Sequence, residues 1–166
     1  MRHIRLYENF EDDLKSARDI FGLTSTFTKI FTDYLGTSRT IEFTGPSELE
    51  GEAKGIAEYL KKNQKTERKI QEELDSIGWQ AVMTSPVRNS SYALKGPLAN
   101  WNAALALIVK WDKDVVKYIE REENDHGGMS EEDLDSLYSY NLNELLESDQ
   151  IRAKCAEIGY QVIEWP

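Results

Sequence analysis

The chain has 166 residues, of which 40% are hydrophobic, and a formal net charge of −10 at pH 7. A chain of this length buries roughly 70% of its unfolded surface, enough for one core without disulfides, and its single cysteine, Cys155, has no internal partner. No apolar run reaches the roughly 20 residues of a membrane span, and no secretory signal is recognisable. We therefore predict a cytoplasmic protein without membrane contact that folds as a single domain, residues 1–166, with 1–96 and 97–166 as candidate sub-lobes.

The N-terminal third of the sequence carries signals for two strands and two helices. Alternating side chains predict a strand over residues 3–7. Asn9 and Gly22 are suited to cap the two ends of a helix that lies between them. A second helix is expected over residues 26–34, followed by a strand over residues 39–44. The expected inner face of that second helix carries Phe27, Ile30, Phe31 and Tyr34.

The middle of the chain predicts a helical stretch followed by a hairpin. Ser47 and the glutamate three residues later form a capping box that opens a helix. The charged stretch that follows either continues this helix or breaks it near Thr66, and Gly78 ends the stretch as a left-handed residue. Residues 79–83 then alternate as a strand, and residues 92–94 are expected to pair with it across a turn.

The strongest helix signal begins at Pro97 and keeps a 3.6-residue apolar period for about six turns. Residues 125–128 form the clearest loop, and Ser130 with Asp133 makes a capping box for the next helix. A final helix ends at Gly159 and leads into a strand. The apolar stripe of the long helix comprises Leu98, Trp101, Leu105, Ile108, Trp111 or Asp112, Val115 and Ile119. The four tryptophans, Trp79, Trp101, Trp111 and Trp165, and the thiol of Cys155 are expected in the core.

These elements predict an α+β fold that is mostly helical, with a small sheet of four or five short strands. Residues 77–80 (IGWQ) and 158–161 (IGYQ) share a helix end, a glycine and a strand start, 81 positions apart. At the same offset Tyr59 falls on Tyr140 and Ile70 on Ile151. Two interpretations stay open. One is a duplicated helix-helix-strand unit, and the other is the common use of glycine and an aromatic where a helix enters a strand.

Catalytic signatures are missing from the sequence. It has no phosphate-binding glycine loop, no nucleophile elbow, no zinc-protease helix and no paired CxxC. His126, beside Asp125, is the candidate base of a small enzyme, but adjacent residues in a glycine-flanked loop are ordinarily solvated. The acidic run from Glu131 to Asp135 has the oxygens that Mg²⁺ or Ca²⁺ prefers, yet it also complements a helix N-terminus and lacks a glycine turn. We predict no enzymatic activity, no cofactor and no metal site.

The basic residues do not predict a surface for nucleic acid. The cluster of Lys61, Lys62, Lys65, Arg68 and Lys69 is interleaved with glutamates. Pairing between oppositely charged side chains one helical turn apart explains this run better than a track for phosphates does. We therefore expect no direct binding of nucleic acid.

The acidity of the chain is concentrated in residues 112–149, which we call the acidic segment. It holds thirteen Asp and Glu against Lys113, Lys117 and Arg121, so its net charge of −10 equals that of the whole chain. Rows of helix carboxylates, about 6 Å apart per turn, can occupy a basic groove that is built for phosphates. The alternative is a solvated face that keeps the protein soluble. The candidate binding residues are Asp112, Asp114, Glu120, Glu122, Glu123, Asp125, Glu131, Glu132, Asp133 and Asp135.

The first ten residues, MRHIRLYENF, resemble the basic-aliphatic-aromatic-Glu-x-Phe openings that are common on small proteins of tailed phages. The resemblance implies a leader that is cut after a Leu-x-Glu site, which Leu6-Tyr7-Glu8 matches. Together with the acidity, it favours a phage or mobile-element protein that inhibits a host protein, such as a defence nuclease, by covering a basic surface as a DNA mimic. The alternatives are a virion or internal head protein, a toxin-immunity protein, and a small enzyme that uses His126.

Overall fold

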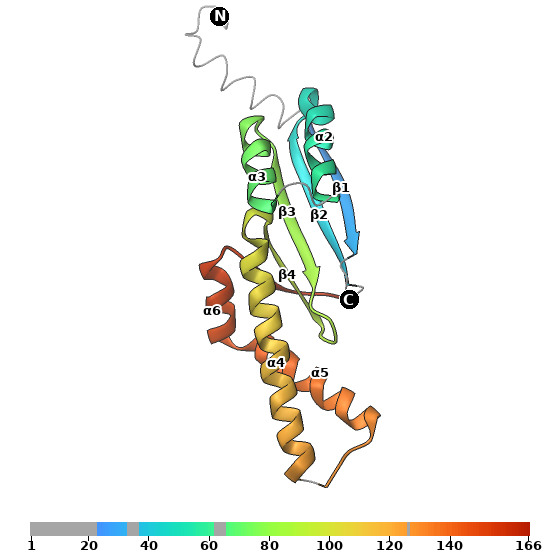
Figure 1. Cartoon of the computed structure of the whole chain (residues 1–166). Helices are drawn as coiled ribbons and strands as arrows, with labels where there is room; N and C mark the ends of the chain where they lie inside the picture. Colours follow the sequence, from blue (N-terminus) through green and yellow to red (C-terminus); the bar gives the residue numbers. More distant parts are fainter. Residues whose placement is uncertain (1–22, 33–36, 62–65, 126) are drawn as a thin grey trace, which may run out of the picture. The chain divides into compact units, whose positions relative to one another are not determined.

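The structure is a computed structural model that describes residues 23–32, 37–61, 66–125 and 127–166. The predicted strand over residues 3–7, the helix of residues 9–22, the phage-like opening and His126 lie outside these residues. The described part is an α+β fold, as predicted, with a five-stranded antiparallel sheet in the order β1-β2-β3-β4-β5 (Figure 1). The strands are β1 (Thr24–Thr32), β2 (Ser38–Pro46), β3 (Gln80–Pro86), β4 (Tyr92–Pro97) and β5 (Gln161–Glu164). The α-helices are α2 (Glu50–Lys61), α3 (Glu67–Ser76), α4 (Trp101–Asp125), α5 (Glu131–Glu147) and α6 (Asp149–Glu157).

The chain divides into two compact units. The first takes its described residues from 1–28 and 42–81, and the second takes them from 29–41 and 82–166. Strands β1, β2 and β3 each contribute residues to both units. The boundaries differ from the sub-lobes 1–96 and 97–166 because they fall inside strands, whereas sequence signals for breaks mark the ends of elements.

The predicted helix over residues 26–34 is wrong, because β1 covers most of this stretch. Its sequence, TSTFTKIFT, places a threonine at every second position over most of the strand, and β-branched residues favour the extended chain. Phe27 and Phe31 are half-buried on one face, while Ile30 is 72% exposed on the other. A helix would have placed all three on one side, so the period of two prevailed over the apparent period of 3.6.

In the first unit, β2 leads through a short 3-10 turn, η2 (Ser47–Leu49), into α2. The predicted capping box at Ser47 is wrong, because its hydroxyl donates to the carbonyl of Leu23 at 2.7 Å and no side chain caps the turn. Thr66 caps α3 by accepting from the amide of Lys69 at 3.2 Å, which confirms a helix start at this position. The core of the first unit includes the buried residues Phe43, Ala53, Ala57, Ile70, Leu74 and Trp79. The half-buried ring of Phe27 stacks on that of Phe43 at 4.7 Å and also lies against Trp79.

The second unit contains the predicted hairpin and the long helix. Strands β3 and β4 pair antiparallel, with Met83 opposite Gly96, across a turn in which Asn89 has a positive φ of 66°. Strand β4 leads through a second 3-10 turn, η3 (Leu98–Asn100), into α4. Helix α4 packs against α5, α5 against α6, and α6 against β5. Ser130 caps α5 by accepting from the amide of Asp133 at 3.2 Å, as predicted.

Each unit contains a junction in which an aromatic ring covers a glycine. In the first junction, a Cβ atom on Gly45 would lie 2.4 Å from the ring of Trp79, whose Nε1 donates to the Pro46 carbonyl at 3.1 Å. In the second junction, a Cβ atom on Gly96 would lie 2.5 Å from the ring of Tyr160. The Tyr160 hydroxyl donates to the carbonyl of Pro97 at 2.7 Å. Only glycine lets the ring approach the strand this closely.

The helix ends that precede the two aromatics also match. Gly78 and Gly159 have positive φ angles of 74° and 80°. The amide of Trp79 donates to Leu74 and that of Tyr160 to Cys155, both at 2.9 Å, which is the bond pattern of a Schellman helix end. The likeness between the two units therefore extends beyond residues 77–80 and 158–161 to the pairs Gly45-Pro46 and Gly96-Pro97.

The matching elements show where the second unit is longer. The starts of α2 and α4 lie 51 positions apart, at residues 50 and 101, whereas Trp79 and Tyr160 lie 81 positions apart. Counted from the helix starts, the last residue of α2 corresponds to Asp112. The additional chain thus comprises the second half of α4 and all of α5, and it lies within the acidic segment. Tyr59 in α2 and Tyr140 in α5 share no structural position, so that part of the sequence match is accidental.

The core of the second unit contains most of the predicted apolar stripe. Leu98, Trp101, Trp111, Val115 and Ile119 are buried, while Asp112 is exposed, so the stripe follows Trp111. The thiol of Cys155 is fully buried, as predicted, and burial raises its pKa. The prediction that Trp165 is a core residue is wrong: it is 39% exposed, because the chain leaves β5 at Glu164.

Candidate functional site

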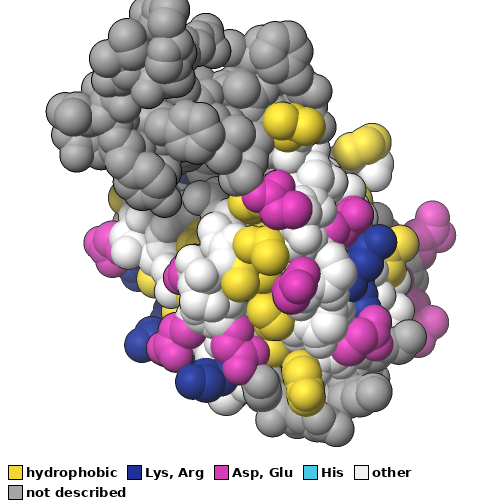
Figure 2. Space-filling model, turned by 90° about the horizontal axis from the view of Figure 1, so that it is seen from above, with side chains coloured by type: hydrophobic (Ala, Val, Ile, Leu, Met, Phe, Trp, Pro, Cys, Tyr) yellow, Lys and Arg dark blue, Asp and Glu magenta, His cyan; other side chains and the backbone are white. Residues whose placement is uncertain are grey.

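The acidic segment forms the distal part of a helical hairpin made by α4 and α5 (Figure 1). Of the ten predicted binding residues, eight are exposed, and Glu122 and Glu123 are half-buried. On the face drawn in Figure 2, acidic and basic side chains lie next to one another. The acidic segment carries the thirteen acids of residues 112–149 against three basic residues, so negative charge gathers on this hairpin.

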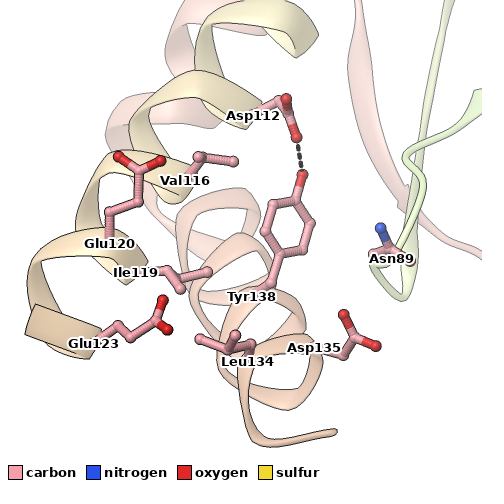
Figure 3. A pocket seen from close by; sticks show the side chains of 9 residues that line it. All are labelled: Asn89, Asp112, Val116, Ile119, Glu120, Glu123, Leu134, Asp135 and Tyr138. Carbon is pink, nitrogen blue, oxygen red and sulfur yellow. Dashed lines mark hydrogen bonds between the residues drawn. The ribbon is translucent and has the colours of Figure 1, made fainter. Parts of the chain in front are cut away.

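Four of the predicted acids line one cleft between α4 and α5, with a volume of about 300 Å³. Asp112, Glu120 and Glu123 come from α4, and Asp135 comes from α5. Figure 3 shows these carboxylates around a floor of apolar side chains, with Asn89 of the β3–β4 turn at one side. The apolar floor consists of Val116, Ile119 and Leu134. This acidic cleft is negative at its rim and apolar at its base.

A hydrogen bond from Tyr138 to Asp112 closes one end of the acidic cleft (Figure 3). Burial and this bond to the carboxylate raise the pKa of the Tyr138 hydroxyl well above its usual range. The phenol therefore keeps its proton, and its donation to Asp112, to a higher pH than an ordinary tyrosine does. Sequence analysis missed Tyr138 as a site residue, because its partner lies 26 positions away and only the packing of α5 on α4 brings them together.

The other predicted acids do not line the acidic cleft. Asp114 accepts from Lys110 of the same helix at 3.0 Å. The acids Glu131 to Asp133 occupy the first turn of α5, where they complement the positive helix end. Glu122 and Asp125 lie in the last turns of α4. The predicted set is thus one surface region of the hairpin and not one converging site.

The hairpin also exposes apolar and aromatic side chains among its carboxylates. Val116 and Tyr118 of α4 and Tyr140 of α5 are all at least 39% exposed. The hydroxyl of Tyr140 donates to Glu144 at 2.9 Å, which pairs an aromatic ring with an acid on the surface. Exposed aromatic residues are enriched in protein interfaces, whereas solubility alone does not call for them.

A second cleft lies along the first half of α4, and its residues were not predicted. Its volume is about 420 Å³, and it shares Asn89, Asp112 and Tyr138 with the acidic cleft. We call it the α4–β3 cleft. Its walls are mostly apolar, and Arg39, Arg88 and Lys113 bring three positive charges to its lining. Arg39 could have been noticed from its position on β2, where it shares the inward face with Ile41.

Two further features bear on the class of site. Among residues 23–32, 37–61, 66–125 and 127–166, no group of three or more His, Cys, Asp and Glu residues is placed to hold a metal ion. Within the same ranges, no helix combines the length and the apolar character that crossing a bilayer requires. Comparisons with protein families, with curated proteins and with solved structures found no match for this chain.

Proposed function

We propose that the protein binds a basic surface of another protein through the acidic segment and thereby blocks that surface. The observation that carries this proposal is the coincidence of the charge with the additional chain of the second unit. The net charge of −10 resides in residues 112–149, which begin where α4 outlasts its counterpart α2. A frame shared by both units is thus extended in one of them by an exposed acidic hairpin.

The chemistry of the partner follows from the hairpin. Carboxylates that repeat at each helical turn lie about 5.4 Å apart, and phosphates on one DNA strand repeat about every 3.4 Å. Both are rows of closely spaced negative charges, so a basic groove that holds nucleic acid is the kind of surface that complements the hairpin. The partner we infer is a nucleic-acid-binding host protein such as a defence nuclease, and the protein is then a DNA mimic of phage or mobile-element origin that acts in the host cytoplasm.

The mixture of charges and aromatic rings suits a specific complex. Carboxylates around the rim accelerate encounter with a basic partner and set its orientation. Tyr118 and Tyr140 supply the exposed rings that carry affinity in many interfaces. This role requires binding and no catalysis, and a toxin-immunity protein would use the same physics on another basic partner.

The test is a pull-down from bacterial lysate in about 50 mM and about 500 mM NaCl, with bound proteins identified by mass spectrometry. The variant reverses four acids of the hairpin: Glu122→Lys, Glu123→Lys, Glu131→Lys and Glu132→Lys. The matched control reverses four exposed acids outside it: Glu42→Lys, Glu52→Lys, Glu157→Lys and Glu164→Lys. Both change the net charge equally, so unspecific attraction is lost from both.

We expect the unchanged protein and the control to retain nucleic-acid-binding proteins at low salt but not at high salt. Duplex DNA should displace these proteins. The hairpin variant should lose them. Equal retention by the hairpin variant, or binding that is insensitive to salt, would contradict the proposal. Loss of the same proteins from both variants would reduce the effect to net charge and would contradict it as well.

A further inference from the structure

We propose that the α4–β3 cleft binds a small amphipathic anion, a carboxylate with an apolar body. This inference uses residues of the second unit alone and does not depend on the proposed partner. Apolar side chains from the β3–β4 turn, α4 and α5 form the walls. They are Val87, Leu105, Ile108, Val109 and Leu142. The volume of about 420 Å³ lies within the range of about 300–1,000 Å³ that is usual for small-molecule sites.

The long helix explains why these apolar residues meet in a cleft. Leu105 and Ile108 belong to the periodic stripe of α4, yet both are only half-buried, and Val109 is 41% exposed. The same stripe is buried on both sides of them, at Trp101 and at Trp111. The stripe thus continues through the cleft. There the described core covers its apolar side chains only in part, so they can contact a ligand.

The positive charges of the cleft select the sign of the ligand. Arg39, Arg88 and Lys113 line it, against one carboxylate, Asp112, which already accepts a hydrogen bond from Tyr138. The lining thus carries three basic side chains and one acidic side chain. An anionic group therefore suits this lining better than a cationic group does.

Arg39 is held rigidly at the cleft. Its side chain is 9% exposed, its Nε donates to the buried Ser85 hydroxyl at 3.2 Å, and its guanidinium lies 4.4 Å from the centre of the Trp101 ring. Because this guanidinium is already fixed, it loses little further conformational freedom when it binds a ligand. Arginine binds a planar carboxylate through two parallel N–H groups. The apolar walls then take the body of the ligand.

The experiment uses octanoate as the probe and octylammonium as a probe of equal chain length and opposite charge. Each is titrated into the ¹⁵N- and methyl-labelled full chain and followed by NMR. Octanoate should shift signals of Val87, Leu105, Val109 and Leu142 in a saturable way, and octylammonium should not. Equal binding of both probes would overturn the proposal, because the cleft would then recognise only the alkyl chain. Absence of saturable shifts with octanoate would overturn it too.

The variants test the charges. Lys113→Glu should weaken octanoate binding about fivefold. Lys117→Glu, an equal change at another exposed lysine of α4 that does not line the cleft, should leave it unchanged. Arg39→Gln should weaken binding about tenfold or more, with folding checked by circular dichroism. Equal effects of Lys113→Glu and Lys117→Glu would overturn the proposal even if Arg39→Gln fails to fold.

Discussion

The two junctions of the chain are built alike, and the regions between them are not. In both, an aromatic ring lies on a glycine, and its polar atom donates to the carbonyl of the next proline. In the first unit, α2 and α3 together cover 22 residues of helix. In the second, α4 alone has 25 residues and α5 adds 17. The common part is the scaffold, and the difference is the acidic segment.

This difference separates residues that hold the fold from residues that are available for function. The buried residues of the shared part include Trp79 and Tyr160. Within residues 120–135, by contrast, none of the described side chains is buried. Residues 120–135 contain eight of the thirteen acids of the acidic segment, and because none of their described side chains is buried, this part of the chain is free to vary with a partner. The following predictions test this separation, from the largest effect on stability to the smallest.

Truncating the aromatic residues of the junctions should have the largest effect. Trp79→Ala should lower the free energy of unfolding by about 3–5 kcal/mol, because it leaves a cavity and removes the donor to Pro46. Tyr160→Ala should cost a comparable amount in the second junction. The control, Trp165→Ala, should cost less than about 0.5 kcal/mol, since that ring is largely exposed. Urea unfolding followed by circular dichroism measures all three, and a similar loss for Trp165→Ala would contradict the assignment of the core.

Adding one methyl group at the glycines of the junctions should have the next largest effect. Gly45→Ala and Gly96→Ala should each cost about 1–3 kcal/mol, because the new Cβ atom would collide with the aromatic ring. Gly55→Ala is the control: nothing lies within 4 Å of its added Cβ atom, and alanine in a helix interior should gain about 0.5–1 kcal/mol. The same unfolding measurement applies, and unequal losses at Gly45 and Gly96 would show that the two junctions are alike in geometry only.

Excising the distal hairpin should affect stability less and binding more. Replacing residues 120–135 by a short glycine-containing turn removes eight of the ten predicted binding residues. We expect a loss of about 1–2 kcal/mol from the half-buried side chains removed, or roughly 2–8 °C in Tm. Salt-sensitive partners of the pull-down should disappear. If the shortened chain unfolds without a cooperative transition, residues 120–135 belong to the core and their separation from the scaffold is wrong.

The scaffold was predicted from sequence more fully than the site, for physical reasons. Helix stops at Gly78 and Gly159 and the cap at Ser130 depend on local backbone chemistry, which a short window contains. Most of the helix predicted over residues 26–34 is a strand, because a short apolar pattern there fits both the helical period of 3.6 and the strand period of 2. Convergence across elements leaves no local signal: nothing near Tyr138 indicates that it donates to Asp112, or that Arg39 lies over Trp101. The sequence therefore located the acidic segment but neither of the two clefts.

The bond between Tyr138 and Asp112 joins the added helix α5 to the residue of α4 that corresponds to the end of α2, and it should have the smallest effect. In the folded chain the pKa of Tyr138 lies above its ordinary value of 10.0, so the unfolded chain loses this proton first as the pH rises. The stabilisation by the bond is thus complete below about pH 10 and declines above it. Tyr138→Phe should destabilise the chain at pH 8, and the difference from the unchanged protein should shrink by pH 11. Tyr140→Phe, at a tyrosine that is 61% exposed, should show a smaller change with pH. If the two variants respond alike, the bond contributes no more than a solvated surface pair, and α5 is held to α4 by its apolar contacts alone.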